Sequence, residues 1–418
     1  MQYVPSFALF PRLSVLDISG NNIFDVSFVV GVEGNQRWKL LDLSNNPIDA
    51  SYLLPLLYSI DVKGLGVAGL IDIDGIQQWN GLSQLTYLDV SNTGLRYFDA
   101  SSVPNLQVLK IADNYIEGLD LTNTHRLTEL NVANNRLTDD FVSNLPMNIR
   151  KLNLSNNTKL ISLDNLGYME SIVELRLSGL RLEQSNLFYW QSPLNQKAHQ
   201  LRVLDVSSTD LVDATLHEFK YLKELNVSDT TFYPAFDGVN QQLIEKLYVA
   251  NIAFHQGFSL QGFTLKELDI SGYSGDDLSG VLSGIDANGL TELYLNNIVG
   301  GGIAGGDILD TLNEIYPLYE QRSVLRTLAL DGTNISDLGL LDGFVNLKAV
   351  SLRNNQLTDV AVLSQYQNLN SIDVYGNQLT DVSPLHNVFG LRSLDVGNNS
   401  GIVLSDVDVV LQNNPEVT

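Results

Sequence analysis

The stretch Leu41-Asp-Leu-Ser-Asn-Asn46 decides how this 418-residue chain is organised. Close copies of this stretch begin at Leu16, Leu88, Leu130, Leu152, Leu204, Leu225, Leu268 and Leu394. With its flanking residues the pattern is L-x-x-L-x-L-x-x-N-x-L, as in residues 127–137. An internal repeat of roughly 20–29 residues with this spacing is typical of a solenoid, in which each coil packs only on its neighbours.

The repeats predict about seventeen coils in a single domain, residues 1–418, with most coils 21–22 residues apart. Their first apolar residues are Leu13, Trp38, Leu57, Leu85, Leu106, Leu127, Ile149, Ile172, Leu201, Leu222, Ile244, Leu265, Leu290, Leu325, Leu347, Leu369 and Leu391. Because L-x-L has a period of two, Leu41 and Leu43 point to one side of a short strand and Asp42 to the other. Stacked strands then form one curved parallel sheet on the concave side, with irregular or helical segments on the convex side.

The later coils carry the sequence motifs Leu357-Thr-Asp-Val360 and Leu379-Thr-Asp-Val-Ser-Pro-Leu385. This resembles the 22-residue repeats of bacterial internalin-like leucine-rich-repeat proteins. Residues 116–127 look like the 21-residue repeat of other bacterial surface proteins. The resemblance covers nearly the whole chain and implies an α/β leucine-rich-repeat solenoid. It also implies a surface or secreted protein that binds another protein, as an adhesin does, and a cytoplasmic location is the alternative.

The composition narrows the class of partner. The formal net charge is −24, which repels a phosphate backbone and anionic lipid, so nucleic acid is not an expected partner. No run of apolar residues is long enough to span a membrane, and Met1–Pro11 lacks the basic start of a signal peptide. With no cysteine there are no disulfides or thiolate sites. The expected partner is a protein, either basic or glycosylated.

No catalytic constellation is visible, and we expect the chain not to be an enzyme. The histidines fall at unrelated repeat positions, namely His125, His199, His217, His255 and His386. There is no H-E-x-x-H and no serine elbow. Two alternatives to a recognition module stay open: a passive spacer in a large surface protein, and the recognition half of an effector whose catalytic domain lies elsewhere.

One column of the repeat is predicted to hold the coils together. Buried asparagine amides can satisfy the backbone groups that the turn after each strand leaves unpaired. The column reads Asn21, Asn46, Asn114, Asn135, Asn157, Asn355, Asn377 and Asn399. Threonine can make part of this bonding at Thr93, Thr209, Thr230 and Thr333, whereas Leu65, Leu180, Ile252, Tyr273 and Ile298 cannot. These exceptions reflect either apolar filling or local reshaping for a ligand.

We expect the concave face to contact the ligand through the residues that lie between the buried leucines. One column begins with four acidic residues, Asp17, Asp42, Asp61 and Asp89. Strands lie about 4.8 Å apart, so we expect these carboxylates to raise each other's pKa. These aspartates either belong to the common repeat motif L-D-x-S without a further role, or they hold a basic ligand. No cofactor is expected, and calcium is the one candidate cation, at this strip or at the loop Gly69–Gly75, which lacks the other acidic ligands of a calcium loop.

A second candidate patch is aromatic. Tyr248 and Tyr294, with Tyr273, are predicted on the concave side of coils eleven to thirteen, and Phe232 and Tyr233 follow a nearby strand. Tyrosine supplies large contact area and is enriched in binding hot spots. This patch coincides with the coils that lack the asparagine.

Insertions are predicted at 63–81, 182–200 and 299–323. The first contains Gly69-Leu-Ile-Asp-Ile-Asp-Gly75, the second Phe188-Tyr-Trp190, and the third a glycine run followed by an amphipathic stretch at 308–316. Neither end shows a polar capping segment, so we expect the chain to be a piece of a longer protein.

Overall fold

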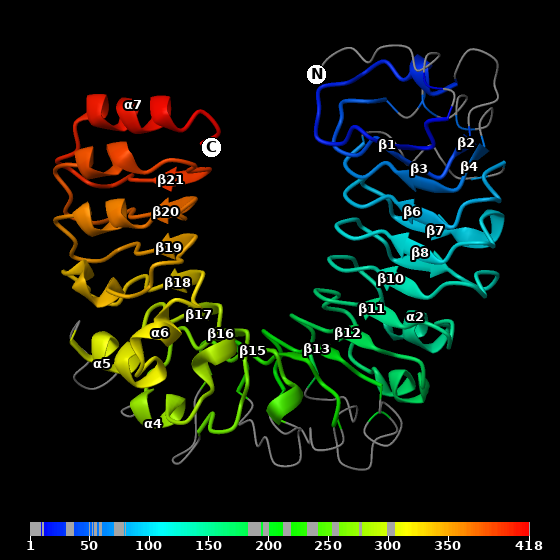
Figure 1. The fold of residues 1–418 in the computed structure, drawn as a ribbon. Coiled ribbons are helices and arrows are strands. Elements are labelled where there is room, and N and C mark those ends of the chain that lie inside the picture. The colour runs from blue at the N-terminus through cyan, green and yellow to red at the C-terminus, as the bar shows by residue number, and fades with distance from the viewer. Residues whose placement is uncertain are drawn as a thin grey trace. The chain divides into compact units, whose positions relative to one another are not determined.

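The computed structural model describes residues 10, 12–30, 37–49, 51, 53, 57, 61–70, 79, 81–182, 194, 200–211, 219–231, 241–252, 259–275, 278–298 and 306–417. The chain divides into two compact units, Met1–Lys220 and Tyr221–Thr418. Each unit is a stack of coils, and in each the strands form a parallel ladder (Figure 1).

The first unit contributes nine ladder strands, each paired in parallel with the next. They are β1 (Val15–Asp17), β3 (Leu40–Asp42), β5 (Gly64–Gly66), β6 (Tyr87–Asp89), β8 (Val108–Lys110), β10 (Glu129–Asn131), β11 (Lys151–Asn153), β12 (Glu174–Arg176) and β13 (Val203–Asp205). The second unit contributes eight, β14 (Glu224–Asn226), β15 (Lys246–Tyr248), β16 (Glu267–Asp269), β17 (Glu292–Tyr294), β18 (Thr327–Ala329), β19 (Ala349–Ser351), β20 (Ser371–Asp373) and β21 (Ser393–Asp395). One strand for each of the seventeen predicted coils confirms the solenoid.

Short elements connect successive ladder strands. In the first unit these are η2 (Ser27–Val30), β2 (Arg37–Trp38), β4 (Asp61–Val62), β7 (Tyr97–Asp99), η4 (Ala100–Ser102), β9 (Gly118–Asp120), α2 (Asp139–Ser143) and η5 (Asp164–Tyr168). β2 pairs with β4, and β7 with β9, as two small separate sheets. In the second unit they are η6 (Gln241–Leu243), α4 (Leu278–Leu282), η7 (Ala287–Gly289), α5 (Gly306–Ile315), α6 (Tyr319–Arg322), η8 (Leu338–Leu341), η9 (Ala361–Gln365) and η10 (Ser383–Asn387), and α7 (Leu404–Asn413) follows the last strand.

Among the described residues no helix is both long and apolar enough to cross a bilayer.

The third coil differs from its prediction. Asp42 pairs in register with Gly66, so β5 is the strand of this coil, whereas Asp61 lies in β4 opposite Arg37. The predicted insertion at 63–81 is therefore placed wrongly at its start. The sequence misleads here because Ile60-Asp61-Val62 imitates the repeat, while Gly64-Leu-Gly66 carries glycine where other coils carry polar residues.

The asparagine column forms the predicted ladder of hydrogen bonds inside the stack. Asn135 is 7% exposed, and its side-chain nitrogen donates to three carbonyls, those of Ile111 at 2.9 Å, Val132 at 3.0 Å and Ala133 at 3.1 Å. Its oxygen accepts from the backbone N–H of Ile116 at 2.9 Å. Since Ile111 and Ile116 belong to the preceding coil, each such asparagine joins two coils.

Threonine and apolar residues replace the asparagine as expected. The Thr230 hydroxyl donates to the carbonyl of Val227, in its own coil, at 2.7 Å. Leu180, Ile252 and Ile298 are buried and fill the same space with apolar atoms. In the third coil the equivalent residue is Leu70, which is 1% exposed, and not Leu65, which lies in β5.

A second column explains why the repeat so often reads Asn-Asn or Gly-Asn. The residue before the ladder position adopts a left-handed conformation in every described coil, with φ of 55° at Asn45 and 70° at Gly272. Only glycine, asparagine and aspartate enter this region at low cost, and serine does so once, at Ser208. In LDLSNN, therefore, Asn45 makes the turn and Asn46 makes the ladder.

The insertions are accounted for in part. The amphipathic stretch of the third insertion is confirmed as α5, which buries Ile308, Leu312 and Ile315, followed by the buried Tyr316. Residues 183–193, with the Phe188–Trp190 triplet, lie outside the described residues, as do 71–78 and 299–305.

Candidate functional site

Most ladder strands present two exposed or half-buried side chains on either side of one buried residue, whereas β5 has glycine at both positions. Together these flanking residues make one face of the ladder, called the sheet face here. In β10 the pattern is Glu129 and Asn131 around buried Leu130, and in β15 it is Lys246 and Tyr248 around buried Leu247. Parallel register then aligns each position with its equivalent in the next coil. The sheet face is therefore two columns wide, and the face predicted to be concave is this one.

The acidic strip is interrupted. Asp17, Asp42 and Asp89 lie in the predicted column, but Gly66 stands between the last two, and Asp61 is outside the column in an ion pair with Arg37 at 3.5 Å. Within the described residues no three His, Cys, Asp or Glu side chains are grouped so that they could hold a metal ion.

The aspartates of this column have a structural task. In each the side-chain oxygen accepts a hydrogen bond from the backbone N–H two residues later, as between Asp42 and Ser44 at 3.0 Å and between Asp89 and Ser91 at 3.0 Å. Asp17 also accepts from the Ser19 hydroxyl at 2.7 Å. These bonds lower the pKa of Asp17, so the expectation that neighbouring carboxylates raise it is wrong there.

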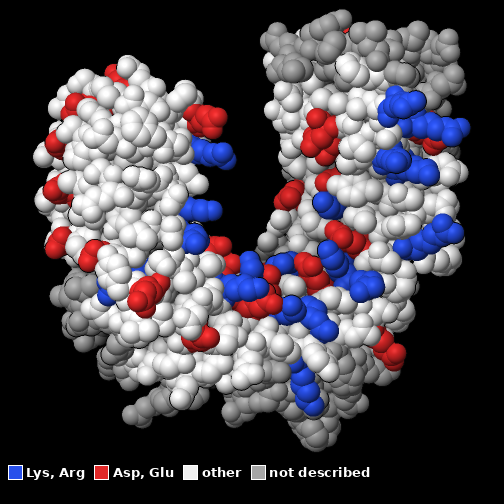
Figure 2. All heavy atoms as spheres, in the orientation of Figure 1, with Lys and Arg blue, Asp and Glu red and all other residues white. Residues whose placement is uncertain are grey.

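The middle of the first unit has a hollow of about 210 Å³ on the sheet face, lined by polar residues of β8, β10, β11 and β12. Lys151 lies 3.6 Å from Glu129 and 4.0 Å from Glu174, and Arg176 lies 2.9 Å from Glu174. Figure 2 shows basic and acidic side chains interspersed in this region. The charges of the hollow are therefore paired with one another.

Lys110 and Tyr87 extend this pairing toward β6. The Lys110 ammonium lies 5.4 Å from the centre of the Tyr87 ring, within the range of a cation–π contact. Burial alone would lower the pKa of Lys110, but Tyr87, Asp89 and Glu129 outweigh it and leave the pKa raised.

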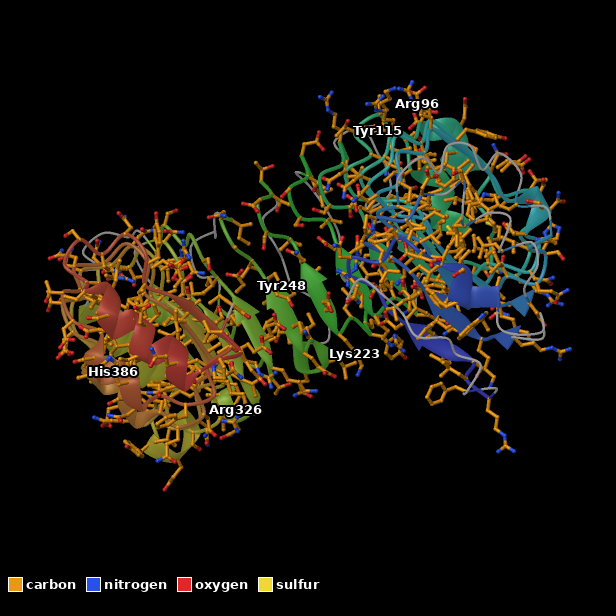
Figure 3. All side chains as sticks on the ribbon, turned by 90° about the horizontal axis from the view of Figure 1, so that it is seen from above. Arg96, Tyr115, Lys223, Tyr248, Arg326 and His386 are labelled. Atoms are coloured by element: carbon orange, nitrogen blue, oxygen red, sulfur yellow. The ribbon has the colours of Figure 1, made fainter. Side chains whose placement is uncertain are left out.

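The second unit carries the predicted tyrosines on β15 and β17, and Tyr248 lies on the face of the strands in Figure 3. Tyr248 and Tyr294 flank Asp269 of β16 in register. The Tyr294 hydroxyl donates to Glu292 at 3.0 Å, and Tyr248 is hydrogen-bonded to Glu267. Burial, followed by these bonds to carboxylates, raises the pKa of both tyrosines, so both hydroxyls stay protonated.

Tyr273 does not belong to this patch. It occupies the asparagine position of its coil and is 5% exposed, so its predicted place on the concave surface is wrong. Apolar filling decides its orientation, because the ladder position points into the stack. Phe232 and Tyr233 lie outside the described residues.

Sequence reasoning missed the other column of the sheet face. It contains Glu129, Lys151 and Glu174 in the first unit, and Glu224, Lys246, Glu267 and Glu292 in the second. The signal was present, since Glu-Leu opens five copies of the repeat, at 129, 174, 224, 267 and 292. Both residues that flank the buried leucine face outward, and only the second had been considered.

The edge where the strands begin carries a further charge cluster in the second unit. Glu245 accepts from Lys223 at 2.9 Å and from Lys266 at 2.6 Å, and these bonds lower the pKa of Glu245 to about 2. Lys223 and Arg326 lie along this edge in Figure 3. Near the other end of the unit, Arg353 bridges Asp373 and Asp395 and stacks on Tyr375.

Comparison with known proteins supports the fold. A leucine-rich-repeat protein of Leptospira interrogans matches with a TM-score of 0.52 and 19% identity, covering 99% of this chain and 97% of that one. An internalin from Listeria monocytogenes matches with a TM-score of 0.45 and 22% identity, over 82% of this chain and 89% of the internalin.

At the sequence level, a probable serine/threonine-protein kinase of Dictyostelium discoideum, pats1, is 30% identical over 186 residues. That match spans 42% of this chain and only 6% of the kinase. No known family profile matches the chain. Seventeen ladder strands and a structural match over nearly the whole chain show that this protein has the leucine-rich-repeat fold, and so confirm its resemblance to bacterial leucine-rich-repeat proteins at the level of fold.

Proposed function

We propose that this chain is a non-catalytic protein-recognition module that binds its partner through the sheet face. The observation that carries the proposal is the pair Tyr248 and Tyr294, half buried and held by the carboxylates of Glu267 and Glu292. A rigid tyrosine offers large contact area and loses little conformational freedom on binding. The internalin-like wording of the repeats supports a surface or secreted, adhesin-like protein as the setting.

A peptide-display selection against the purified 418-residue chain tests this function. Selected peptides should bind the Tyr248→Ala/Tyr294→Ala variant at least about tenfold more weakly, because truncated hot-spot residues typically cost more than 1 kcal/mol each. The matched control is Tyr97→Ala/Tyr115→Ala, which removes two exposed tyrosines outside the sheet face. If both double variants lose the same affinity for the selected peptides, or if neither loses any, recognition by this face is contradicted.

A second candidate is the recognition segment of a larger signalling protein, favoured by the partial match to the Dictyostelium kinase. The two settings differ in location. Protease treatment of intact cells should cleave a surface protein and spare one enclosed by the membrane. The gene sequence on both sides of this segment would show an anchor in the first case and a catalytic domain in the second.

A further inference from the structure

The sheet face of β15, β16 and β17 holds a row of three side chains, Tyr248, Asp269 and Tyr294, in register. Neighbouring strands are about 4.8 Å apart, so the two tyrosines are attached on the order of 10 Å from each other with the carboxylate between them. A guest side chain placed between the two rings would therefore lie over Asp269.

The tyrosine hydroxyls are already occupied. Tyr294 donates to Glu292, and Tyr248 is hydrogen-bonded to Glu267. Ring orientation is thereby fixed before any ligand arrives, which lowers the conformational cost of binding. What remains to offer a ligand is the π face of each ring and the charge of the carboxylates.

Among the described residues, two of the three acidic side chains on β16 and β17 of the sheet face have no cation paired with them. Lys246 pairs with Glu267 at 2.7 Å. Asp269 accepts one bond from the Ser271 N–H at 2.9 Å, and among the described residues neither Asp269 nor Glu292 has a salt bridge to a cation. An excess of negative charge beside two aromatic faces favours a cationic guest, by charge attraction and by cation–π contact.

We propose that β15–β17 bind a basic peptide segment, with an arginine side chain held between Tyr248 and Tyr294 above Asp269. This proposal rests on the proposed function of the sheet face and names its ligand chemistry. Arginine fits better than lysine because its planar guanidinium stacks on aromatic rings and bonds a carboxylate through two N–H groups. The net charge of −24 acts in the same direction by attracting basic partners.

Fluorescence anisotropy with a labelled Arg-Gly repeat peptide tests the proposal, in 150 mM salt to suppress diffuse attraction. The decisive variant is Asp269→Asn. Asparagine keeps the turn, because Asn226 in the same column accepts from the Ser228 N–H at 3.0 Å. Only the charge is lost, and we expect binding to weaken about fivefold to tenfold.

The matched control is Asp89→Asn in the first unit, which removes one charge from the same column and keeps the same turn bond to Ser91. Its affinity for the peptide should stay within about twofold of wild type, and a peptide with citrulline in place of arginine should bind at least about tenfold more weakly to wild type. Equal weakening by both variants would show diffuse attraction and overturn the proposal. So would equal binding of the citrulline peptide.

These outcomes separate the proposal from the function on which it rests. If display selection yields peptides that need Tyr248 and Tyr294 but carry no basic residue, the sheet face recognises protein and the arginine proposal is wrong. If no selected peptide needs the tyrosines, the proposed function itself fails.

Discussion

The block β10–β12 of the first unit and the block β15–β17 of the second are built from the same repeat but balance their charges differently. In the first block Lys151 stands between Glu129 and Glu174, and Arg176 pairs with Glu174 and Asp205. In the second block one lysine faces three acidic residues, and the column that holds Asn131, Asn153 and Arg176 in the first block holds Tyr248, Asp269 and Tyr294. The block proposed to bind a partner is thus the one in which negative charge is left over after the internal ion pairs are made.

The interiors of the two blocks differ as well. In the first block the side chains of Asn135 and Asn157 form hydrogen bonds to the preceding coil, and each is called an asparagine staple here. In the second block Ile252, Tyr273 and Ile298 fill the same positions, and inside the stack apolar packing takes the place of the asparagine bonds. Loss of the staple and gain of the tyrosines therefore occur on the same coils.

The turn of the second block should be its most sensitive point. Gly272 has φ of 70°, and a Cβ there would overlap the side-chain amide of Asn251. Gly272→Ala should cost roughly 2–4 kcal/mol through strain and overlap. In the first unit Gly94 has φ of 81° with no atom within 4 Å of such a Cβ, so Gly94→Ala should cost only about 1–2 kcal/mol. Urea unfolding measures both, and equal costs would refute the packing argument.

The difference between the asparagine and threonine positions inside the two units can be measured as the stability lost when each side chain is truncated. Asn135→Ala leaves several buried backbone groups unpaired and should cost roughly 1–3 kcal/mol. Thr230→Val in the second unit removes a single bond, to Val227, and should cost at most about 1 kcal/mol. Thermal melts of the two proteins give the comparison. An Asn135→Ala melting curve identical to wild type would remove the case for the staple.

The smallest effect concerns the strand-start edge of the second block. Because the pKa of Glu245 is lowered from 4.5 to about 2, its ion pairs add stability above about pH 4.5, and that stability is lost as pH falls through 2. Glu245→Gln should thus lower the melting temperature at pH 7 and make little difference near pH 2. The side chain is 34% exposed, so the cost stays below about 1 kcal/mol. Glu117→Gln, with cations at 3.9 Å, is the control and should change less.

Sequence alone predicted most of the fold, because buried leucines at fixed spacing leave few alternatives. It failed at Asp61, where Ile60-Asp-Val62 imitates a ladder strand that Gly64-Leu-Gly66 forms instead. The charge contrast between the blocks was not predictable from one column, since Glu267 and Glu292 lie in the other. Tyr273 was placed on two faces at once, and only its burial decided between them.

The asparagine staples have a mechanical consequence. Asn355, Asn377 and Asn399 each join a coil to the coil before it, so a pulling force on the last coils of the second unit meets a buried cross-link at each of them. The coils of β15–β17 lack this asparagine and are joined by their backbone ladder, by apolar packing and by bonds nearer the surface, such as that from Asn251 to Asp229 at 2.8 Å. In a protein held under tension, we expect the segment that carries Tyr248 and Tyr294 to be the first part of this unit to lengthen.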